Sequence, residues 1–394
     1  MSSPPSNNDS VLVLLPIMLA VFLSFMVIGM VLPVLPIHIR YVLGFGPFVV
    51  GIITGCQFTA SMLTRFSAGR LADSRTPKHA VVTGLAATVV GGLFYLVSLS
   101  LLDLPALSIT AIFVGRICLG AAESLMITGG VAWGLSLASP HASGKVIAWV
   151  GSALFAALAV GAPIGSYLFS KTGFLGIAVA TALIPLVVLA IVLPLKSSPT
   201  RSSSKPRLST VFKAVFLPGL GLALSGILFG AMTGFLTLYF YSRGWDSGAW
   251  AFATFAASLV LTRFILGNLT DRFGGARVVI ICLIVQILGL LLINLAPSAE
   301  FAIVGSFICG AGFSLVFPGF GLEAVRRAPI DGRGLAMGTY AAFMDLALGL
   351  GTPALGFMGG AVSLGFVFIA TAIASLLAIP IAVHLMRRSP QPLK

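Results

Sequence analysis

Two side chains of opposite charge lie in one apolar segment of this chain, and their type and spacing suggest chemistry. In GRICLGAAESLMITGG, Gly115 to Gly130, Arg116 precedes Glu123 by seven residues. On a helix that spacing puts both on one face, about 10.5 Å apart along the axis, too far for a comfortable direct pair. A charge at membrane depth costs at least about 2.5–3.5 kcal/mol and normally faces a cavity. We therefore expect both to line a cavity and to meet groups on other helices or water; the alternative is a structural salt bridge between helices.

A third charge, Asp345, lies in the apolar stretch TYAAFMDLALGLGTP. It is the only charged residue between positions 335 and 358. Its isolation favours a place in the same cavity, because a carboxylate facing lipid is costly. The alternative is a hydrogen bond to a helix-interface hydroxyl such as that of Thr339.

The segments that must position these charges are membrane-spanning helices. Hydrophobic residues make up 58% of the chain and charged residues only 8%, whereas soluble domains have about 25% charged residues. About 20 apolar residues cross a bilayer as a helix, and twelve such runs occur. They cover residues 11–36, 48–70, 80–101, 106–133, 145–168, 174–195, 214–241, 249–270, 277–296, 300–323, 335–358 and 363–386. The fold class predicted is an all-α membrane protein.

The distribution of Lys and Arg predicts the orientation. If both termini are cytoplasmic, seventeen of the 23 basic residues fall in cytoplasmic segments, three in external loops and three within spans. An excess of Lys and Arg in the cytoplasmic segments sets the orientation of membrane proteins in the bilayer. The net charge of +13 is therefore spread over loops, and we expect a lipid bilayer and not nucleic acid as the partner of these charges.

The chain also contains an internal repeat. TRFSAGRLADSR, beginning at Thr64, returns as TRFILGNLTDRF, beginning at Thr262, with six of twelve residues identical at an offset of 198. Duplication at half-length in a membrane chain is typical of transporters. We predict an N-terminal six-helix bundle (1–195), a cytoplasmic linker (196–213) and a C-terminal six-helix bundle (214–394). In the second copy of the charged segment, at an offset of 190, Ser306 replaces Arg116 and Phe313 replaces Glu123, so the fold does not require those charges.

These features resemble the major facilitator superfamily, whose loop after span two carries a G-x-L-x-D-R-like motif. The first copy here is Gly69, Leu71, Asp73, Arg75 and Lys78, and the second is Gly267, Leu269, Asp271, Arg272 and Arg277. Within the superfamily, GRICLGAAESLMITGG in span four and SGKVIAW with GAPIG in span five resemble the drug and sugar efflux proton antiporters, near the bacterial permeases called YhhS-type. The resemblance implies two pseudo-symmetric bundles of six helices around a central cavity, in a monomer.

The resemblance also implies a conformational latch built on the duplicated motif. It places Asp73 against the start of span eleven and Asp271 against the start of span five. A carboxylate facing a helix N-terminus is worth up to about 2 kcal/mol when partly buried. The latch predicted comprises Gly69, Asp73, Arg75, Asp271, Arg272, Glu323 and Arg326, the last two pairing with the loop around Arg272 and Arg277. The alternatives are interfacial anchoring by basic side chains and, for Glu323 and Arg326, a solvated loop.

Arg116 and Gly120 resemble the R-x-x-x-G pattern of proton-coupled members of the superfamily. By that likeness Arg116 is linked to proton transfer and Glu123 is a protonation site. Desolvation favours the protonated form of such a carboxyl, whereas a nearby cation favours its ionised form. The competition between the two effects lets proton and substrate exclude one another. Many drug antiporters have an acid in span one, and this chain has none, so Asp345 is the second coupling candidate.

Span five carries Gly161, Pro163 and Gly165, which resemble the G-P-x-x-G-G-like pattern of efflux antiporters. That likeness predicts a rocking interface between the halves and favours export. The alternative is tight helix packing, because small residues let helices approach closely and proline bends a helix.

Aromatic and methionine side chains are the candidate walls of the substrate cavity, since such surfaces suit bulky amphipathic ligands. They are Phe25, Met26, Met30, Phe229, Met232, Phe235, Tyr239, Tyr340, Phe343 and Met344. The alternative for many of them is contact with lipid.

The function predicted is export of a small amphipathic compound in exchange for protons, in a bacterial inner membrane. The alternative is a symporter or facilitator that takes up a small organic solute. We expect no enzymatic activity, no cofactor and no metal, because the four cysteines and four histidines have no ligand spacing. A receptor or enzyme would need an extramembrane domain or a catalytic cluster, and the sequence shows neither.

Overall fold

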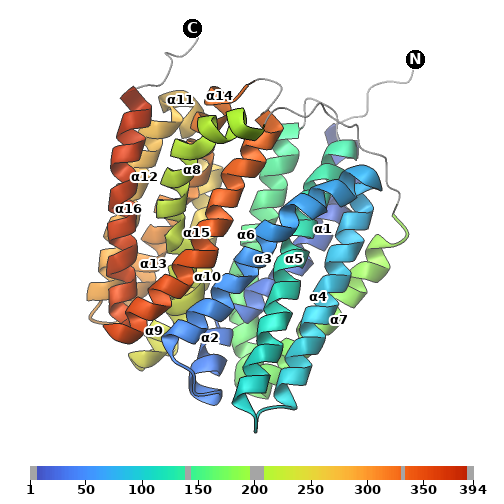
Figure 1. Ribbon diagram of the computed structural model, residues 1–394, viewed down its shortest axis with the longest axis vertical. Helices are drawn as coiled ribbons and strands as arrows, with labels where there is room; N and C mark the ends of the chain where they lie inside the picture. Colours follow the sequence, from blue (N-terminus) through green and yellow to red (C-terminus); the bar gives the residue numbers. More distant parts are fainter. Residues whose placement is uncertain (1–6, 138–142, 196–207, 330–332, 388–394) are drawn as a thin grey trace. The chain divides into compact units, whose positions relative to one another are not determined.

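The structure is a computed structural model that describes residues 7–137, 143–195, 208–329 and 333–387 (Figure 1). The described residues form helices and no strands. Twelve of the helical segments are long and apolar enough to cross a membrane. The predicted all-α membrane fold with twelve spans is confirmed.

The chain divides into two compact units, residues 1–44 with 56–202, and residues 45–55 with 203–394. The helices of the first half are α1 (Asn7–Val31), α2 (Leu35–Ile37), the π-helical turn η1 (His38–Val42), α3 (Pro47–Ser74), α4 (Pro77–Leu99), α5 (Pro105–Leu137), α6 (Ser143–Thr172) and α7 (Phe174–Val192). The helices of the second half are α8 (Leu208–Ala231), the π-helical turn η3 (Met232–Leu236), α9 (Thr237–Ser242), α10 (Gly248–Leu266), α11 (Leu269–Phe273), α12 (Gly275–Leu295), α13 (Ala299–Ser314), α14 (Val316–Arg327), α15 (Arg333–Ala361) and α16 (Leu364–Arg387).

Helix α3 is divided by this grouping, although it is continuous. Its first part, through Gly55, belongs with the second unit, where a Cβ atom added at Gly51 would lie 2.6 Å from the carbonyl oxygen of Thr352 on α15. Its remainder belongs with the first unit. The sequence-based boundaries assign the whole helix to the N-terminal bundle.

The two units repeat one packing pattern. In the first, α4 packs against α5 and α7, and α1 packs against α6 and α7. In the second, α12 packs against α13 and α16, and α8 packs against α15 and α16. Each pair in the first unit has its counterpart in the second, which is what a duplicated six-helix unit predicts.

Corresponding glycines make close helix contacts in both units. A Cβ atom added at Gly115 would lie 3.0 Å from the carbonyl oxygen of Gly91, which joins α5 to α4. One added at Gly305 would lie 2.9 Å from that of Gly289, which joins α13 to α12. These positions correspond at the offsets of 190 and 198 seen in the sequence. The duplication therefore extends from the loop motif to the backbone contacts that set the helix spacing.

The predicted span over 300–323 is a broken helix, and proline is the reason. Pro318 has no amide hydrogen to give to the carbonyl of Ser314, four residues earlier, so α13 ends there and α14 begins at Val316. Nη2 of Arg263 on α10 donates instead to the Ser314 carbonyl, at 3.0 Å. Arg263, an intramembrane charge of the repeated motif, thus satisfies a carbonyl that the helix cannot.

Candidate functional site

Arg116 lies on α5 and is fully buried. Its guanidinium interacts electrostatically with the Tyr95 hydroxyl on α4 and with Cys56 on α3. The Tyr95 ring can lie there because α5 has no side chain at Gly115, where a Cβ atom would be 2.9 Å from the ring. Groups of α3 and α4 therefore surround Arg116 in the first unit.

Glu123 lies two turns further along α5 and is half-buried. Its Oε2 accepts a hydrogen bond of 2.8 Å from Nε2 of Gln57 on α3. Gly120 makes this contact possible, since a Cβ atom there would lie 2.0 Å from the carbonyl oxygen of Gln57. The backbones of α3 and α5 touch at this point, and the amide reaches the carboxylate across the contact.

The corresponding contact in the second unit has the same close approach of two helix backbones, but it lacks the charged residue. A Cβ atom added at Gly310 would lie 2.1 Å from the carbonyl oxygen of Phe255, so α13 and α10 touch as α5 and α3 do. Gln57 corresponds to Phe255 at the offset of 198, and Glu123 to Phe313 at the offset of 190. Both phenylalanines are buried. The contact between the helices is therefore structural, whereas the amide and the carboxylate are a specialisation of the first unit.

Asp345 lies on α15 in the second unit and is 6% exposed. It is thus a buried carboxyl within a helix that is long and apolar enough to cross a membrane. Its assignment to proton coupling stays a prediction.

The repeated loop motif lies at helix ends. Gly69 is near the end of α3, Arg75 follows that helix and is exposed, and Asp271 and Arg272 are exposed on the short helix α11. The side chain of Asp73 lies outside the described residues. The latch built on this motif stays a prediction.

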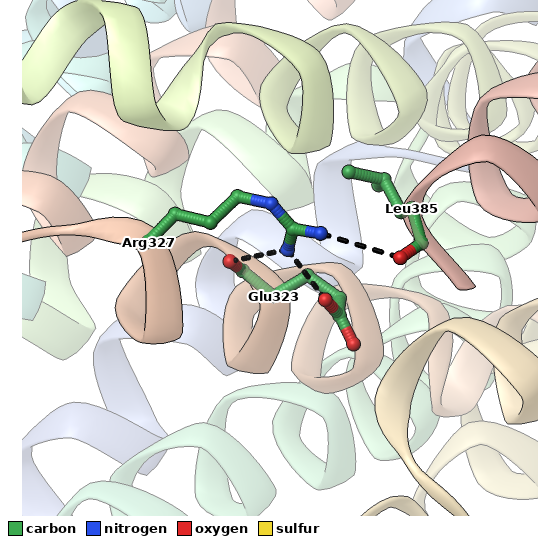
Figure 2. Close-up of polar contacts among 3 residues, drawn as sticks. All are labelled: Glu323, Arg327 and Leu385. Atoms are coloured by element: carbon green, nitrogen blue, oxygen red, sulfur yellow. Dashed lines mark hydrogen bonds and ion pairs between the residues drawn. The ribbon is translucent and has the colours of Figure 1, made fainter. Parts of the chain in front are cut away.

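Glu323 is almost fully buried on α14, and Arg327 is one of its partners (Figure 2). Nη1 of Arg327 donates to Oε2 of Glu323 at 2.5 Å and to the Glu323 carbonyl at 2.9 Å, and Nη2 donates to the Leu385 carbonyl on α16 at 3.3 Å. Arg326, the neighbour named from the sequence, is exposed. The pair therefore ties α14 to α16 within the second unit.

Comparison with known proteins assigns this architecture to a family. The model of the Major Facilitator Superfamily matches residues 17–250 and 246–394, which is nearly the whole chain. The chain belongs to this superfamily. Its members are transporters, so the protein is a membrane transporter and not an enzyme.

Bacterial relatives cover almost the full length. An uncharacterized MFS-type transporter of Salmonella typhimurium is 37% identical over 97% of this chain and 98% of its own. The uncharacterized MFS-type transporter YhhS of Escherichia coli K12 is 36% identical over 94% of this chain and 91% of its own. The predicted relationship to YhhS-type permeases is confirmed.

Solved structures show the same fold. A bacterial homolog of the human lysosomal transporter Spinster, inward-facing and unoccupied, has a TM-score of 0.77 at 15% identity, over 99% of this chain and 100% of the other. The nucleoside transporter NupG has a TM-score of 0.73 at 14% identity, over 96% and 100%. At these identities the likeness concerns the fold alone.

In this superfamily member the span-five motif packs against α1 of its own unit. Cβ atoms added at Gly161 and Gly165 would lie 2.4 and 2.2 Å from the carbonyl oxygens of Met26 and Met30, and Pro163 lies inside α6. The glycines thus make a tight helix contact, the alternative that the sequence left open beside a rocking interface.

Most of the candidate cavity residues are buried. The buried ones are Phe25, Met30, Phe229, Met232, Phe235, Tyr239 and Tyr340, and those partly exposed are Met26, Phe343 and Met344. Tyr340 donates a 2.7 Å hydrogen bond to the Phe317 carbonyl, and Tyr239 donates one of 3.3 Å to the Asn294 carbonyl. These two tyrosines therefore join helices of the second unit, and their role in substrate binding stays a prediction.

Sequence reasoning named neither Gln57 nor Arg327 as a site residue. A signal for Gln57 exists, because its counterpart in the repeat is Phe255, and a polar residue at an apolar position suggests a local role. Among the described residues, no group of three or more His, Cys, Asp or Glu could hold a metal ion.

Proposed function

We propose that this transporter exports a small amphipathic compound in exchange for protons, and that Glu123 carries the proton. The observation that carries the proposal is the asymmetry of the two units. Gln57 and Glu123 form a hydrogen-bonded pair in the first unit, with Arg116 two turns away on α5, whereas the counterparts Phe255, Phe313 and Ser306 carry no charge.

The free-energy cost of these groups supports the proposal. A charge within a span costs about 2.5–3.5 kcal/mol, and the second unit shows that the same helix contacts form without one. A carboxyl kept at that cost, half-buried and hydrogen-bonded to the Gln57 amide, is suited to exchange a proton. Arg116, two turns away on the same helix, would favour the ionised carboxylate and so help release the proton.

Asp345 is the second coupling candidate, because it is a buried carboxyl in the other unit. The repeated loop motif and Glu323 would hold one conformation of the transport cycle and release it in the other. The protein would work as a monomer in the bacterial inner membrane, with both termini cytoplasmic, as the excess of basic residues in those segments supports.

A direct experiment tests both coupling and direction. Compounds that raise the unfolding temperature of the purified protein are loaded into proteoliposomes, and an inward proton gradient is imposed. Antiport moves the compound out of the vesicles, whereas symport moves it in.

The matched variants are Glu123→Gln and Glu300→Gln. Glu300 lies exposed at the start of α13, so its loss should leave transport at the wild-type rate. Glu123→Gln should lose gradient-driven transport and still bind the compound. Full gradient-driven transport by Glu123→Gln would rule out Glu123 as the proton carrier.

A further inference from the structure

Gln57 uses one end of its side-chain amide and leaves the other end unused. The residue is 1% exposed, and its Nε2 donates the 2.8 Å hydrogen bond to Oε2 of Glu123. Its Oε1 is buried and has no hydrogen-bond partner among the residues that the structure describes. A buried polar atom without a partner costs free energy and calls for an explanation.

The chemistry of the neighbouring carboxyl supplies one. An ionised carboxylate only accepts hydrogen bonds, whereas a protonated carboxyl also donates one, and an amide offers both donors and an acceptor. With Glu123 ionised, Nε2 of Gln57 is the matching group. With Glu123 protonated, Oε1 is the matching group, and rotation of the amide about its terminal bond brings it to the same place.

The second unit shows that packing alone does not require this pair. Gly120 and Gly310 bring their helices equally close, yet Phe255 and Phe313 stand where Gln57 and Glu123 stand in the first unit. Both members of the pair are replaced together. The amide is therefore present where the carboxyl is present, and the close helix contact forms without it.

We propose that Gln57 is a positioning residue that holds the Glu123 carboxyl in both protonation states, by donating from Nε2 to the carboxylate and accepting at Oε1 from the acid. The inference rests on the proposed function in that Glu123 carries the proton. It adds that the carboxyl keeps one position while its charge changes, so each transport cycle begins from the same geometry.

Other ionisable groups surround this pair, and they set the field in which Glu123 titrates. Helix α5 packs against α1, α4 and α6, and touches α3 at Gly120. The ionisable side chains described on these helices are Cys56, Arg65 and Arg70 on α3, Lys78, His79 and Tyr95 on α4, Arg116 and Cys118 on α5, and Tyr167 and Lys171 on α6; α1 has none from Ile17 to Val31. The test must therefore compare variants that leave all of these unchanged.

Infrared spectroscopy of the purified full-length protein across a pH series reports the state of one carboxyl. Subtracting the spectrum of Glu123→Gln from that of the wild type isolates the carboxylic-acid band of Glu123 from those of the other Asp and Glu residues. Gln57→Met is the main variant, because methionine nearly matches glutamine in length and has no amide. Gln286→Met is the control, because Gln286 is also fully buried but donates to the Ser225 carbonyl and to Ser375 in the second unit.

In Gln57→Met the band should appear at a pH about one unit higher, since the carboxylate loses a hydrogen bond from the amide. The band should also move to higher frequency, since the acid loses its acceptor. Gln286→Met should change neither property. Exchanging the two groups in Gln57→Glu/Glu123→Gln should restore a band at the wild-type frequency, now from a carboxyl at position 57.

A Glu123 band that is absent, or that has the same pH midpoint and frequency in Gln57→Met as in the wild type, overturns the role of Gln57. If Gln57→Met fails to fold, Gln57→Asn carries the same prediction, because its shorter arm draws the amide away from the carboxyl. The two proposals fail separately, since transport by Glu123→Gln overturns the proton carrier and an unchanged band overturns the positioning residue.

Discussion

Replacing Gly120 by alanine should separate α3 from α5 and disturb the Glu123 site without changing any charge. The added Cβ atom would lie 2.0 Å from the carbonyl oxygen of Gln57 and 2.9 Å from the Cβ atom of Ala60. Ordinary contact begins at 3.4 Å, so the backbones must move apart by roughly 1.4 Å. Backbone atoms cannot rotate away as a side chain can, and the whole contact must therefore shift.

The free-energy change combines two effects of opposite sign. Overpacking costs about 1–3 kcal/mol, and exchanging glycine for alanine within a helix returns up to about 1 kcal/mol. Because the clash is with backbone, we expect the upper part of the first range and a net loss of about 1–2 kcal/mol. Equilibrium unfolding in mixed detergent micelles measures it.

Two matched variants separate packing from chemistry. Gly310→Ala meets the Phe255 carbonyl at 2.1 Å and should lose about as much stability, with the Glu123 infrared band unchanged. Gly338→Ala, within α15, has no atom within 4 Å of the new Cβ and should be neutral or stabilising by up to about 1 kcal/mol. In Gly120→Ala the separation should lengthen the 2.8 Å bond and shift the band as Gln57→Met does. If Gly120→Ala unfolds no more readily than Gly338→Ala, the close contact between α3 and α5 is refuted.

Two further predictions concern the helix ends. Arg327→Met should destabilise the protein by about 1.5–3 kcal/mol, because the buried Glu323 carboxylate loses a charged donor, while the exposed Arg326→Met should change unfolding little; equal losses in both variants would contradict the pairing. Asp73→Asn and Asp271→Asn should each slow transport in proteoliposomes and leave membrane insertion, measured as the yield of folded protein, at the wild-type level; unchanged turnover in both would exclude the latch.

The sequence was sufficient for the architecture because lipid imposes simple rules on a chain. A helix that crosses a bilayer needs about 20 apolar residues, and the twelve runs in the sequence correspond to twelve candidate spans in the structure. The sequence offsets of 198 and 190, seen first in the repeated segments, also relate Gly91 to Gly289 and Gly115 to Gly305. The contact between Gly91 and Gly115 therefore has its counterpart between Gly289 and Gly305. The break in span ten follows from Pro318, which cannot complete a helix, although sequence analysis drew that span as continuous.

The composition of the site was decided only in three dimensions. Gln57 has no charge and lies 66 residues before Glu123, so hydropathy does not distinguish it until α3 and α5 meet at Gly120. Arg326 and Arg327 both follow Glu323 at helical spacing, and the Leu385 carbonyl on α16 favours the second. The sequence by itself therefore determined which segments enter the membrane and that they form two copies, because burial in lipid acts on each segment separately. Tertiary structure decided which polar groups touch, because a hydrogen bond depends on where two distant backbones approach within a few ångströms.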